Sequence, residues 1–200
     1  MPSKTRLILI GGPSHVGKST LAQALTSHLR GSYCSIDKLA RHPGRPWQDG
    51  LKEIPKHVAD HYLSLSVGEL IEDVLLHYRK NVWPLVEKLI AQHTTDSSPE
   101  TFIIEGSALL PDLVAMLDSE NLSSCWLIAS HDFLTRRIYA SSQYEKKSSY
   151  ERKLVDKFLE RNRILNNRIV DAVNQLGLVS FNVEEASTMA ELINTYLQPR

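Results

Sequence analysis

The decapeptide GGPSHVGKST, residues 11–20, follows directly on the apolar run RLILI, residues 6–10. It satisfies the spacing G-x-x-x-x-G-K-[ST] between Gly12 and Ser19. The apolar run predicts a β-strand, and residues 18–29 repeat their leucines at helical spacing. The motif therefore joins a strand to a helix, where backbone N–H groups and the positive helix end converge on one anion. We interpret it as a phosphate-binding loop.

The residues of this loop have predicted roles in holding ATP. Lys18 reaches the β- and γ-phosphates, and the hydroxyl of Ser19 ligates Mg²⁺. Thr20 faces the α-phosphate or packs, Pro13 stiffens the loop and removes one N–H donor, and His15 is expected to be a bystander. The alternative is a glycine turn that holds no ligand. The predicted nucleotide-binding residues are Gly12, Pro13, Ser14, His15, Val16, Gly17, Lys18, Ser19 and Thr20.

Four more short apolar runs alternate with helical patterns: residues 32–36, 101–105, 124–129 and 177–183. They are continuously apolar, as strands are when both faces of a parallel sheet are covered. This order predicts a three-layer α/β/α domain with a five-stranded parallel sheet. The predicted helices cover residues 18–29 and 67–78, begin at Pro84, cover 131–140 and 150–176, and begin again at Thr188.

Acidic residues follow the second and third predicted strands directly. Asp37 comes after one strand and Glu105 after the other. Ligands of open α/β sheets bind beyond the carboxyl ends of the strands, so both acids are expected beside the phosphate-binding loop. We predict that Asp37 orients or deprotonates an acceptor hydroxyl and that Glu105, with Ser19, holds Mg²⁺ or positions water; the two acids can exchange roles. Gly106 is expected to let the backbone approach a ligand closely.

With these motifs, the chain resembles the P-loop small-molecule kinases of the nucleoside-monophosphate-kinase-like group over nearly its full length. Within that group, SIDKLAR (35–41) and FIIEGSALLP (102–111) resemble bacterial proteins described as 2-phosphoglycerate-kinase-like or adenylate-kinase-like ATPases. The resemblance implies one P-loop NTPase domain over residues 1–200. It also implies a helical substrate-binding insertion at about 42–95 and a mobile lid at about 138–153.

The predicted lid is polar, so we expect it to be exposed and able to close over ATP and exclude water. On its flanking helices, Arg137 and Arg161 are predicted to neutralise charge on the transferred phosphoryl group. A solvated helix face is the alternative reading of each arginine.

The loop RHPGRPWQDG, residues 41–50, places cations and an aromatic ring after Asp37. Trp47 either forms an apolar wall of the acceptor site or plugs the insertion against the sheet. The predicted acceptor-binding residues are Asp37, Arg41, Arg45, Trp47 and Gly106.

The composition suits one globular domain: 200 residues, of which 42% are hydrophobic, with zero formal net charge. Zero net charge argues against nucleic acid as the partner. Cys34 and Cys125 are expected to be buried free thiols in a reducing compartment. No apolar run approaches the ~18 residues of a membrane span, so a cytoplasmic protein is expected. We expect it to be a monomer or a homodimer.

These observations together predict a phosphotransferase that uses ATP and Mg²⁺. It would move the γ-phosphoryl group onto a small hydroxylated or phosphorylated acceptor. One alternative is a nucleotide-dependent ATPase switch or regulatory binding protein. Another is a kinase that acts on nucleic-acid ends.

Overall fold

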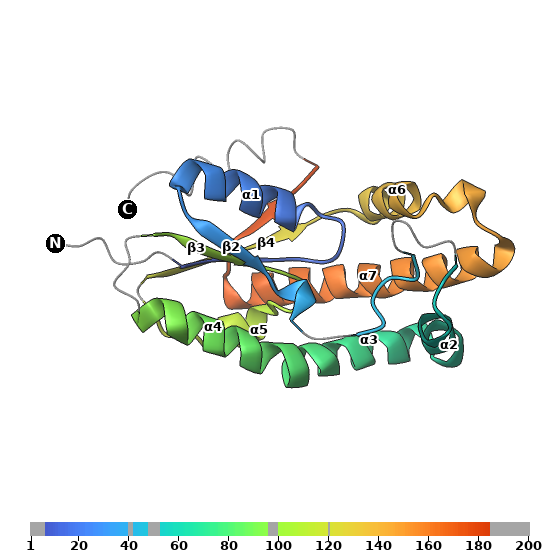
Figure 1. Ribbon diagram of the computed structural model, residues 1–200, viewed down its shortest axis with the longest axis horizontal. Coiled ribbons are helices and arrows are strands. Elements are labelled where there is room, and N and C mark those ends of the chain that lie inside the picture. The colour runs from blue at the N-terminus through green and yellow to red at the C-terminus, as the bar shows by residue number, and fades with distance from the viewer. Residues whose placement is uncertain (1–6, 40–41, 48–52, 96–99, 120, 185–200) are drawn as a thin grey trace.

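The structure is a computed structural model that describes residues 7–39, 42–47, 53–95, 100–119 and 121–184. These residues contain a five-stranded sheet with the order β2-β3-β1-β4-β5, in which every neighbouring pair is parallel. Helices cover both faces of the sheet (Figure 1). The predicted α/β fold with a five-stranded parallel sheet is therefore confirmed.

The bounds of the elements are as follows. The strands are β1 (Leu7–Gly11), β2 (Ser32–Ser35), β3 (Phe102–Glu105), β4 (Leu122–Ile128) and β5 (Ser180–Asn182). The helices are α1 (Lys18–Leu29), α2 (Lys56–Ser64), α3 (Val67–His77), α4 (Trp83–Thr95), α5 (Pro111–Val114), α6 (His131–Ser142) and α7 (Ser149–Leu176). Shorter helical turns are η1 (Ile36–Lys38), η2 (Tyr78–Val82) and η3 (Tyr144–Lys146).

Strand β1 lies at the centre of the sheet. Ile10 near its end pairs with Glu105 of β3 on one side and with Cys125 of β4 on the other. Because all strands are parallel, their carboxyl ends meet at one edge of the sheet. The loop that leaves β1 is therefore flanked by the segments that follow β3 and β4.

The two faces of β1 are buried against different helices. Ile8 and Ile10 belong to a hydrophobic cluster with α1, whereas Leu7 and Leu9 belong to one with α4, α5 and the C-terminal half of α7. None of the four is more than 1% exposed. Burial on both faces explains why the strand is continuously apolar.

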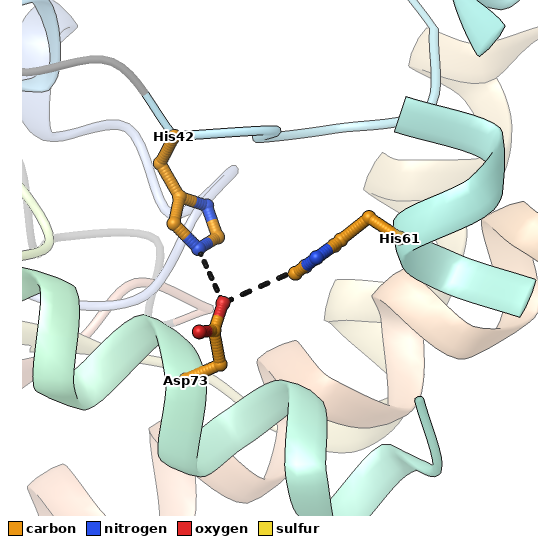
Figure 2. Close-up of side chains that lie close together, drawn as sticks. All are labelled: His42, His61 and Asp73. Atoms are coloured by element: carbon orange, nitrogen blue, oxygen red, sulfur yellow. Dashed lines mark hydrogen bonds and ion pairs between the residues drawn. The ribbon is translucent and has the colours of Figure 1, made fainter. Parts of the chain in front are cut away.

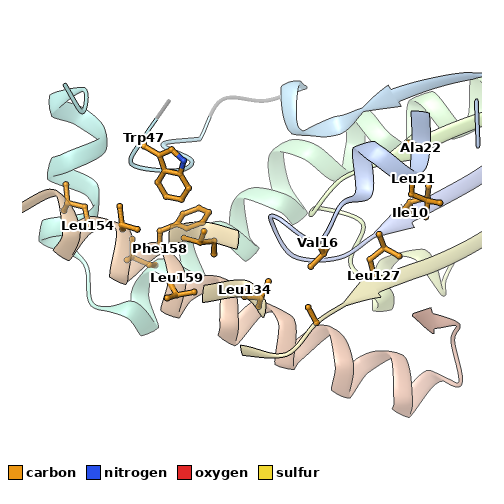
Figure 3. Close-up of a cluster of buried hydrophobic side chains, with 14 of the residues drawn as sticks. Ile10, Val16, Leu21, Ala22, Trp47, Leu127, Leu134, Leu154, Phe158 and Leu159 are labelled. Carbon is orange, nitrogen blue, oxygen red and sulfur yellow. The ribbon is translucent and has the colours of Figure 1, made fainter. Parts of the chain in front are cut away.

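The cluster on the α1 face continues beyond the sheet along α7 (Figure 3). There Trp47 packs edge-on against Phe158, with 4.9 Å between ring centroids, and Leu134 of α6 belongs to the same cluster. This extension joins the loop after β2, α6 and the N-terminal half of α7 into a structured region beyond the carboxyl edge of the sheet (Figure 1).

Helices α3 and α4 form one continuous rod. A capping box closes its start, since Ser66 Oγ accepts from Glu69 N at 3.2 Å and the Glu69 carboxylate accepts from Ser66 N at 2.7 Å. Pro84 lies in the first turn of α4, as predicted, but the π-helical turn η2 carries the chain from α3 into α4 without a break, so the two helices are not separate. The wider turn just before Pro84 fits its missing N–H donor.

Residues 138–153, the predicted lid, contain the end of α6, η3 and the start of α7. Tyr139 and Tyr144 stack with 3.9 Å between ring centroids, and both hydroxyls donate to Asp156 at 2.9 Å. The segment is therefore a hydrogen-bonded corner between two helices in this structure. Its closure over a ligand stays a prediction.

Other sequence predictions meet the structure as follows. The two cysteines form no disulfide. Cys125 is buried, but Cys34 is partly exposed because β2 is an edge strand, so its predicted burial is wrong. The pattern of apolar residues in the sequence does not predict α5, since four residues are too few to show a helical repeat.

The helix predicted from Thr188 lies outside the described residues. Within the described part of the chain, no helix combines the length and hydropathy that a membrane span requires.

Candidate active site

The phosphate-binding loop takes its shape from its glycines. Gly12 and Gly17 have φ of 135° and 93°, which favour glycine. A Cβ on Gly12 would also overlap the carbonyl oxygen of Leu127. The side chain of Val16 is buried in the cluster with α1, whereas Thr20 is exposed and lines the cavity described below.

Lys18 begins α1 and is only 6% exposed. Its Nζ donates to Pro13 O at 2.7 Å and to Ser107 Oγ at 3.2 Å. Burial lowers the pKa of Lys18, and the charges of Asp37 and Glu105 act in the opposite direction. The carbonyl oxygen of Pro13 therefore holds the ammonium group in the loop, and an oxygen of a bound phosphate can take the place of that carbonyl as the acceptor.

Ser19 and Glu105, the two predicted metal ligands, are in contact. Ser19 Oγ donates to Glu105 Oε1 at 2.9 Å. Glu105 is fully buried, and its Oε2 has no hydrogen-bond partner among the described residues. A hydroxyl beside a carboxylate oxygen with free lone pairs is a donor set that suits Mg²⁺. The residues present therefore fit a magnesium ion, held directly or through water.

Asp37 lies on η1 at the tip of the neighbouring strand. Its Oδ1 accepts from Ser107 N at 3.3 Å, so Ser107 contacts both Asp37 and Lys18. A Cβ on Gly106 would overlap the side chain of Ile36. Glycine is thus required for the close approach of η1, and its predicted contact with a ligand stays a prediction.

The loop, Asp37 and the insertion line one open cavity of ≈ 1070 Å³. Its walls come from η1, the loop after β2, α2, α3, η2, α6 and α7. Among the described charged residues that line it, Asp37 is acidic, while the cations are Lys18, Lys38, Arg45, Arg137 and Arg161. The balance of charge favours a polyanionic ligand.

Arg161 lines this cavity and is 7% exposed. Its guanidinium carbon lies 4.8 Å from the ring centroid of Phe158 and 5.6 Å from that of Tyr62. Its Nη1 is buried without a hydrogen-bond partner among the described residues. An uncompensated buried charge is costly, and an anionic ligand would pair it.

Arg137 reaches the same cavity from α6, and His15 connects the loop to that helix. His15 Nε2 lies 2.8 Å from Ser141 Oγ. Burial, and then the charges of Arg45, Lys18 and Arg137, lower the pKa of His15 to about 4. His15 is therefore neutral at pH 7 and ties the phosphate-binding loop to the end of α6 next to the corner.

The predicted acceptor residues after β2 do not all line the cavity. Arg45 is exposed and lines the cavity, with its guanidinium carbon 5.9 Å from the Trp47 ring centroid. Trp47 is buried in the hydrophobic cluster and does not line the cavity, which agrees with the plug alternative. Arg41 lies outside the described residues.

The sequence analysis does not single out Asn162, which holds the loop from α7. Asn162 Oδ1 accepts from Ser14 N at 2.9 Å, and its Nδ2 donates to Ser14 O at 3.1 Å. One turn further, Asn166 makes the same pair of bonds to Ala129, at 3.2 and 3.0 Å. In the sequence, both residues could have been noticed because they are amides that interrupt the apolar stripe of α7, and a buried amide needs hydrogen-bond partners.

Comparison with known proteins identifies the fold. No protein-family model and no curated protein matches the chain. A gluconokinase from Sinorhizobium meliloti 1021 is similar at 17% identity and a TM-score of 0.51, over 98% of this chain and 91% of that chain. Shikimate kinase from Aquifex aeolicus follows at 15% and 0.51, over 96% and 94%. A deoxyadenosine kinase from M. mycoides, solved with bound dATP, gives 16% and 0.53, over 96% and 98%.

The chain has the fold of P-loop small-molecule kinases. The predicted resemblance to the nucleoside-monophosphate-kinase-like group is confirmed at this level. Identities of 15–17% carry the fold and not the substrate of these neighbours. The finer resemblance to 2-phosphoglycerate-kinase-like proteins stays a prediction.

Proposed function

We propose that this protein is an ATP- and Mg²⁺-dependent phosphotransferase that phosphorylates a hydroxyl group of a small anionic acceptor. The observation that carries this proposal is that one cavity runs from Lys18 and Ser19 to Asp37 and Arg161. A nucleotide switch needs the phosphate end of such a cavity but not the far end. The neighbours' fold supports the same reading, since the three solved structures are named as kinases of small molecules.

On the nucleotide side, Lys18 exchanges its bond with Pro13 O for oxygens of the β- and γ-phosphates. The backbone N–H groups of the loop and the start of α1 complete the cradle. Ser19 and Glu105 would hold Mg²⁺, which neutralises phosphate charge when bound. Their contact and the free Oε2 of Glu105 support this assignment.

On the acceptor side, Asp37 accepts the proton of the attacking hydroxyl. The acceptor oxygen forms a bond to the γ-phosphorus, the bond from that phosphorus to the bridging oxygen breaks, and ADP leaves. Arg137 neutralises charge on the transferred group from α6. The position of Asp37 beside Ser107, which also contacts Lys18, supports this role.

Arg161 Nη1, which has no hydrogen-bond partner among the described residues, indicates what else the acceptor carries. A carboxylate or phosphate group would accept from its buried Nη1. Tyr78 lines the same cavity, and burial raises its pKa to about 12, so its hydroxyl is a neutral donor. The favoured acceptor is therefore a small hydroxy acid or a phosphorylated alcohol.

The direct test is a screen of hydroxy acids and phosphorylated alcohols for acceptor-stimulated ADP release with MgATP. We expect a compound of these classes to stimulate turnover, with a phosphorylated product visible by ³¹P NMR. Failure of every anionic acceptor to stimulate ADP release, combined with a protein partner that binds only in the presence of ATP, would instead support a switch.

Asp37→Asn tests the proposed base once an acceptor is known. Removal of a general base lowers kcat by about 10²- to 10⁴-fold, while ATP affinity should stay within about twofold. Unchanged turnover would remove Asp37 from the mechanism.

Arg161→Met tests the anionic group of the acceptor. Loss of a charge-assisted hydrogen bond of about 1.5–3 kcal/mol should raise the KM for the acceptor by about 10- to 100-fold with little change in the KM for ATP. Arg168→Met is the matched control on α7, because Arg168 is half exposed and pairs with Glu72. An equal rise of both KM values would contradict this role.

A further inference from the structure

Two imidazoles and a carboxylate meet on the insertion, next to the large cavity (Figure 2). His42 comes from the loop after β2, His61 from α2 and Asp73 from α3. One ligand atom from each lies within 4.8 Å of the other two. We propose that His42, His61 and Asp73 bind a divalent transition-metal ion, with Zn²⁺ as the best fit, and that this ion fastens the loop after β2 to the insertion.

The distances suit a tetrahedral ion. Asp73 Oδ2 lies 3.0 Å from His42 Nε2 and 3.8 Å from His61 Nε2. With zinc–ligand bonds of about 2.0–2.1 Å, neighbouring ligand atoms lie ~3.3 Å apart, between these two values. Figure 2 shows both rings directed at the carboxylate from different elements. Small side-chain rotations are enough to bring the ligand atoms around one ion.

His61 provides the second observation. Its Nε2 is buried and has no hydrogen-bond partner among the described residues. The His42 and His61 side chains are 12% and 14% exposed, whereas Asp73 is 46% exposed. The imidazoles are thus held in place by the protein, and the carboxylate leaves a path for an ion from solvent. A coordinated metal would satisfy the buried nitrogen.

His42 has to change its hydrogen bonds when the ion binds. At present Gly44 N donates to its Nδ1 at 3.3 Å, so its Nε2 carries the proton that it shares with Asp73. The metal takes the place of that proton at Nε2, and the proton, the only one on the neutral ring, moves to Nδ1. The contact with Gly44 is lost, which is a small cost because the hydrogen bond is long.

The ligand types separate this site from the proposed magnesium site. Imidazole nitrogens suit Zn²⁺ and other late transition metals, whereas the oxygens of Ser19 and Glu105 suit Mg²⁺. Three protein ligands leave a fourth position for water. The three ligand residues line a second cavity of ≈ 370 Å³, together with Lys80 and Asn81, which leaves room for that water.

Because of the position of His42, a bound ion would restrain the loop after β2. His42 lines both cavities, and its loop continues to Arg45 on the wall of the large one. Tyr62 of α2 already contacts this loop through a hydrogen bond to Gly44 O. A bound ion adds a second attachment, between the loop and both α2 and α3, and so restrains one wall of the acceptor end of the cavity.

The test is a titration of the full chain with Zn²⁺ against a chromophoric chelator, in a Cys34→Ser background that removes the exposed thiol. We expect one Zn²⁺ per chain with a Kd in the micromolar range or below, unaffected by millimolar Mg²⁺. Saturating Zn²⁺ should also raise Tm, since it binds the folded state alone. Co²⁺ in the same site should give the visible absorption of a tetrahedral complex.

His61→Ala and Asp73→Asn should each weaken Zn²⁺ binding at least tenfold and abolish the Co²⁺ spectrum. His28→Ala and Asp60→Asn are the matched controls, because these residues are exposed on α1 and α2, and both should bind as the parent does. Asp73→Asn alters a half-exposed side chain, so it decides the question if His61→Ala does not fold. No stoichiometric Zn²⁺ binding, or binding unchanged in Asp73→Asn, overturns the proposal. None of these readouts depends on kinase activity.

Discussion

At the scale of single residues, the site keeps two opposite charges out of water without pairing them fully. Lys18 is 6% exposed and bonded to a backbone carbonyl, and Glu105 is fully buried with one oxygen that has no partner in the described part of the chain. Such groups lower stability in the free protein and favour any ligand that pairs them. We therefore interpret the burial of Lys18 as favouring a phosphate ligand and the burial of Glu105 as favouring a metal ion.

Glu105→Gln is predicted to weaken MgATP binding about tenfold and to leave binding of metal-free ATP unchanged or stronger. The substitution keeps the shape of the side chain and removes the charge that would hold Mg²⁺. Calorimetry with Mg²⁺ and with EDTA measures both affinities. Glu87→Gln, exposed on α4, is the control. An equal loss in both conditions would mean that Glu105 supports the loop rather than the metal.

His15 makes a prediction about pH. Its pKa is about 4 in the folded protein and 6.5 ordinarily, so between these values the unfolded chain binds a proton that the folded chain does not. Stability therefore falls as pH falls from about 6.5 to about 4, by at most about 1.4 kcal/mol per pH unit from this group. Urea unfolding of His15→Gln should show a shallower decline over this window, with His28→Gln as the control. Identical slopes in His15→Gln and the parent would refute this role.

The chemistry-bearing residues of the sheet edge could be predicted from sequence because they occupy fixed positions. The loop motif follows β1, and Glu105 ends the strand beside it. Asn162 could not be predicted in the same way. Its contact with Ser14 joins residues 148 positions apart, and no local pattern encodes that distance.

At the scale of elements, α7 organises the site. Its two buried amides grip different backbone segments: Asn162 holds the phosphate-binding loop at Ser14, and Asn166 holds the end of β4 at Ala129. Lys157, on the same helix, donates to Tyr62 O and Leu65 O at 2.7 Å and so fixes the end of α2. One helix thereby sets the nucleotide and acceptor ends of the cavity relative to each other.

Substitution of Asn162 and of Asn166 should have similar effects on the free energy of unfolding but different effects on MgATP binding. Asn166→Ala leaves two buried backbone groups of Ala129 unpaired, and Asn162→Ala leaves two partly buried groups of Ser14 unpaired. Each substitution should lower the free energy of unfolding by about 1–3 kcal/mol. Asn162→Ala should also weaken MgATP binding about tenfold, because the loop loses its support, whereas folded Asn166→Ala should bind as the parent does. Denaturant unfolding and calorimetry give the two quantities. Equal ATP affinity in both variants would contradict the distinction.

The elements themselves show where sequence patterns lose their predictive value. The long apolar stripe of α7 predicts the helix closely, since the expected range of 150–176 agrees with the observed Ser149–Leu176. Pro84 predicts the first turn of α4, which begins at Trp83, but it does not predict that the π-helical turn η2 joins α4 to α3 without a break. A proline restricts the backbone locally, and whether the chain turns or continues depends on what packs around it.

At the scale of the whole molecule, the large cavity is bounded by a sheet edge, the insertion and the helices α6 and α7, which the corner at η3 connects. The corner is joined to the phosphate-binding loop through His15 and Ser141. Occupation of the loop should therefore restrict the corner. We expect MgATP with an acceptor to slow amide hydrogen exchange over 138–153 at least tenfold, with α4 unchanged as the internal reference. Unaltered exchange in the corner would exclude it as a lid.

The claim on which the account depends is that the loop after β1 binds a nucleoside triphosphate through Lys18. Calorimetric titration of MgATP into the parent protein and Lys18→Met tests it most directly. We predict one site per chain in the parent and a loss of about 10- to 100-fold in affinity for the variant, the value of one charge-assisted hydrogen bond. No affinity of the parent for any purine or pyrimidine triphosphate, or equal affinity in both proteins, would contradict it.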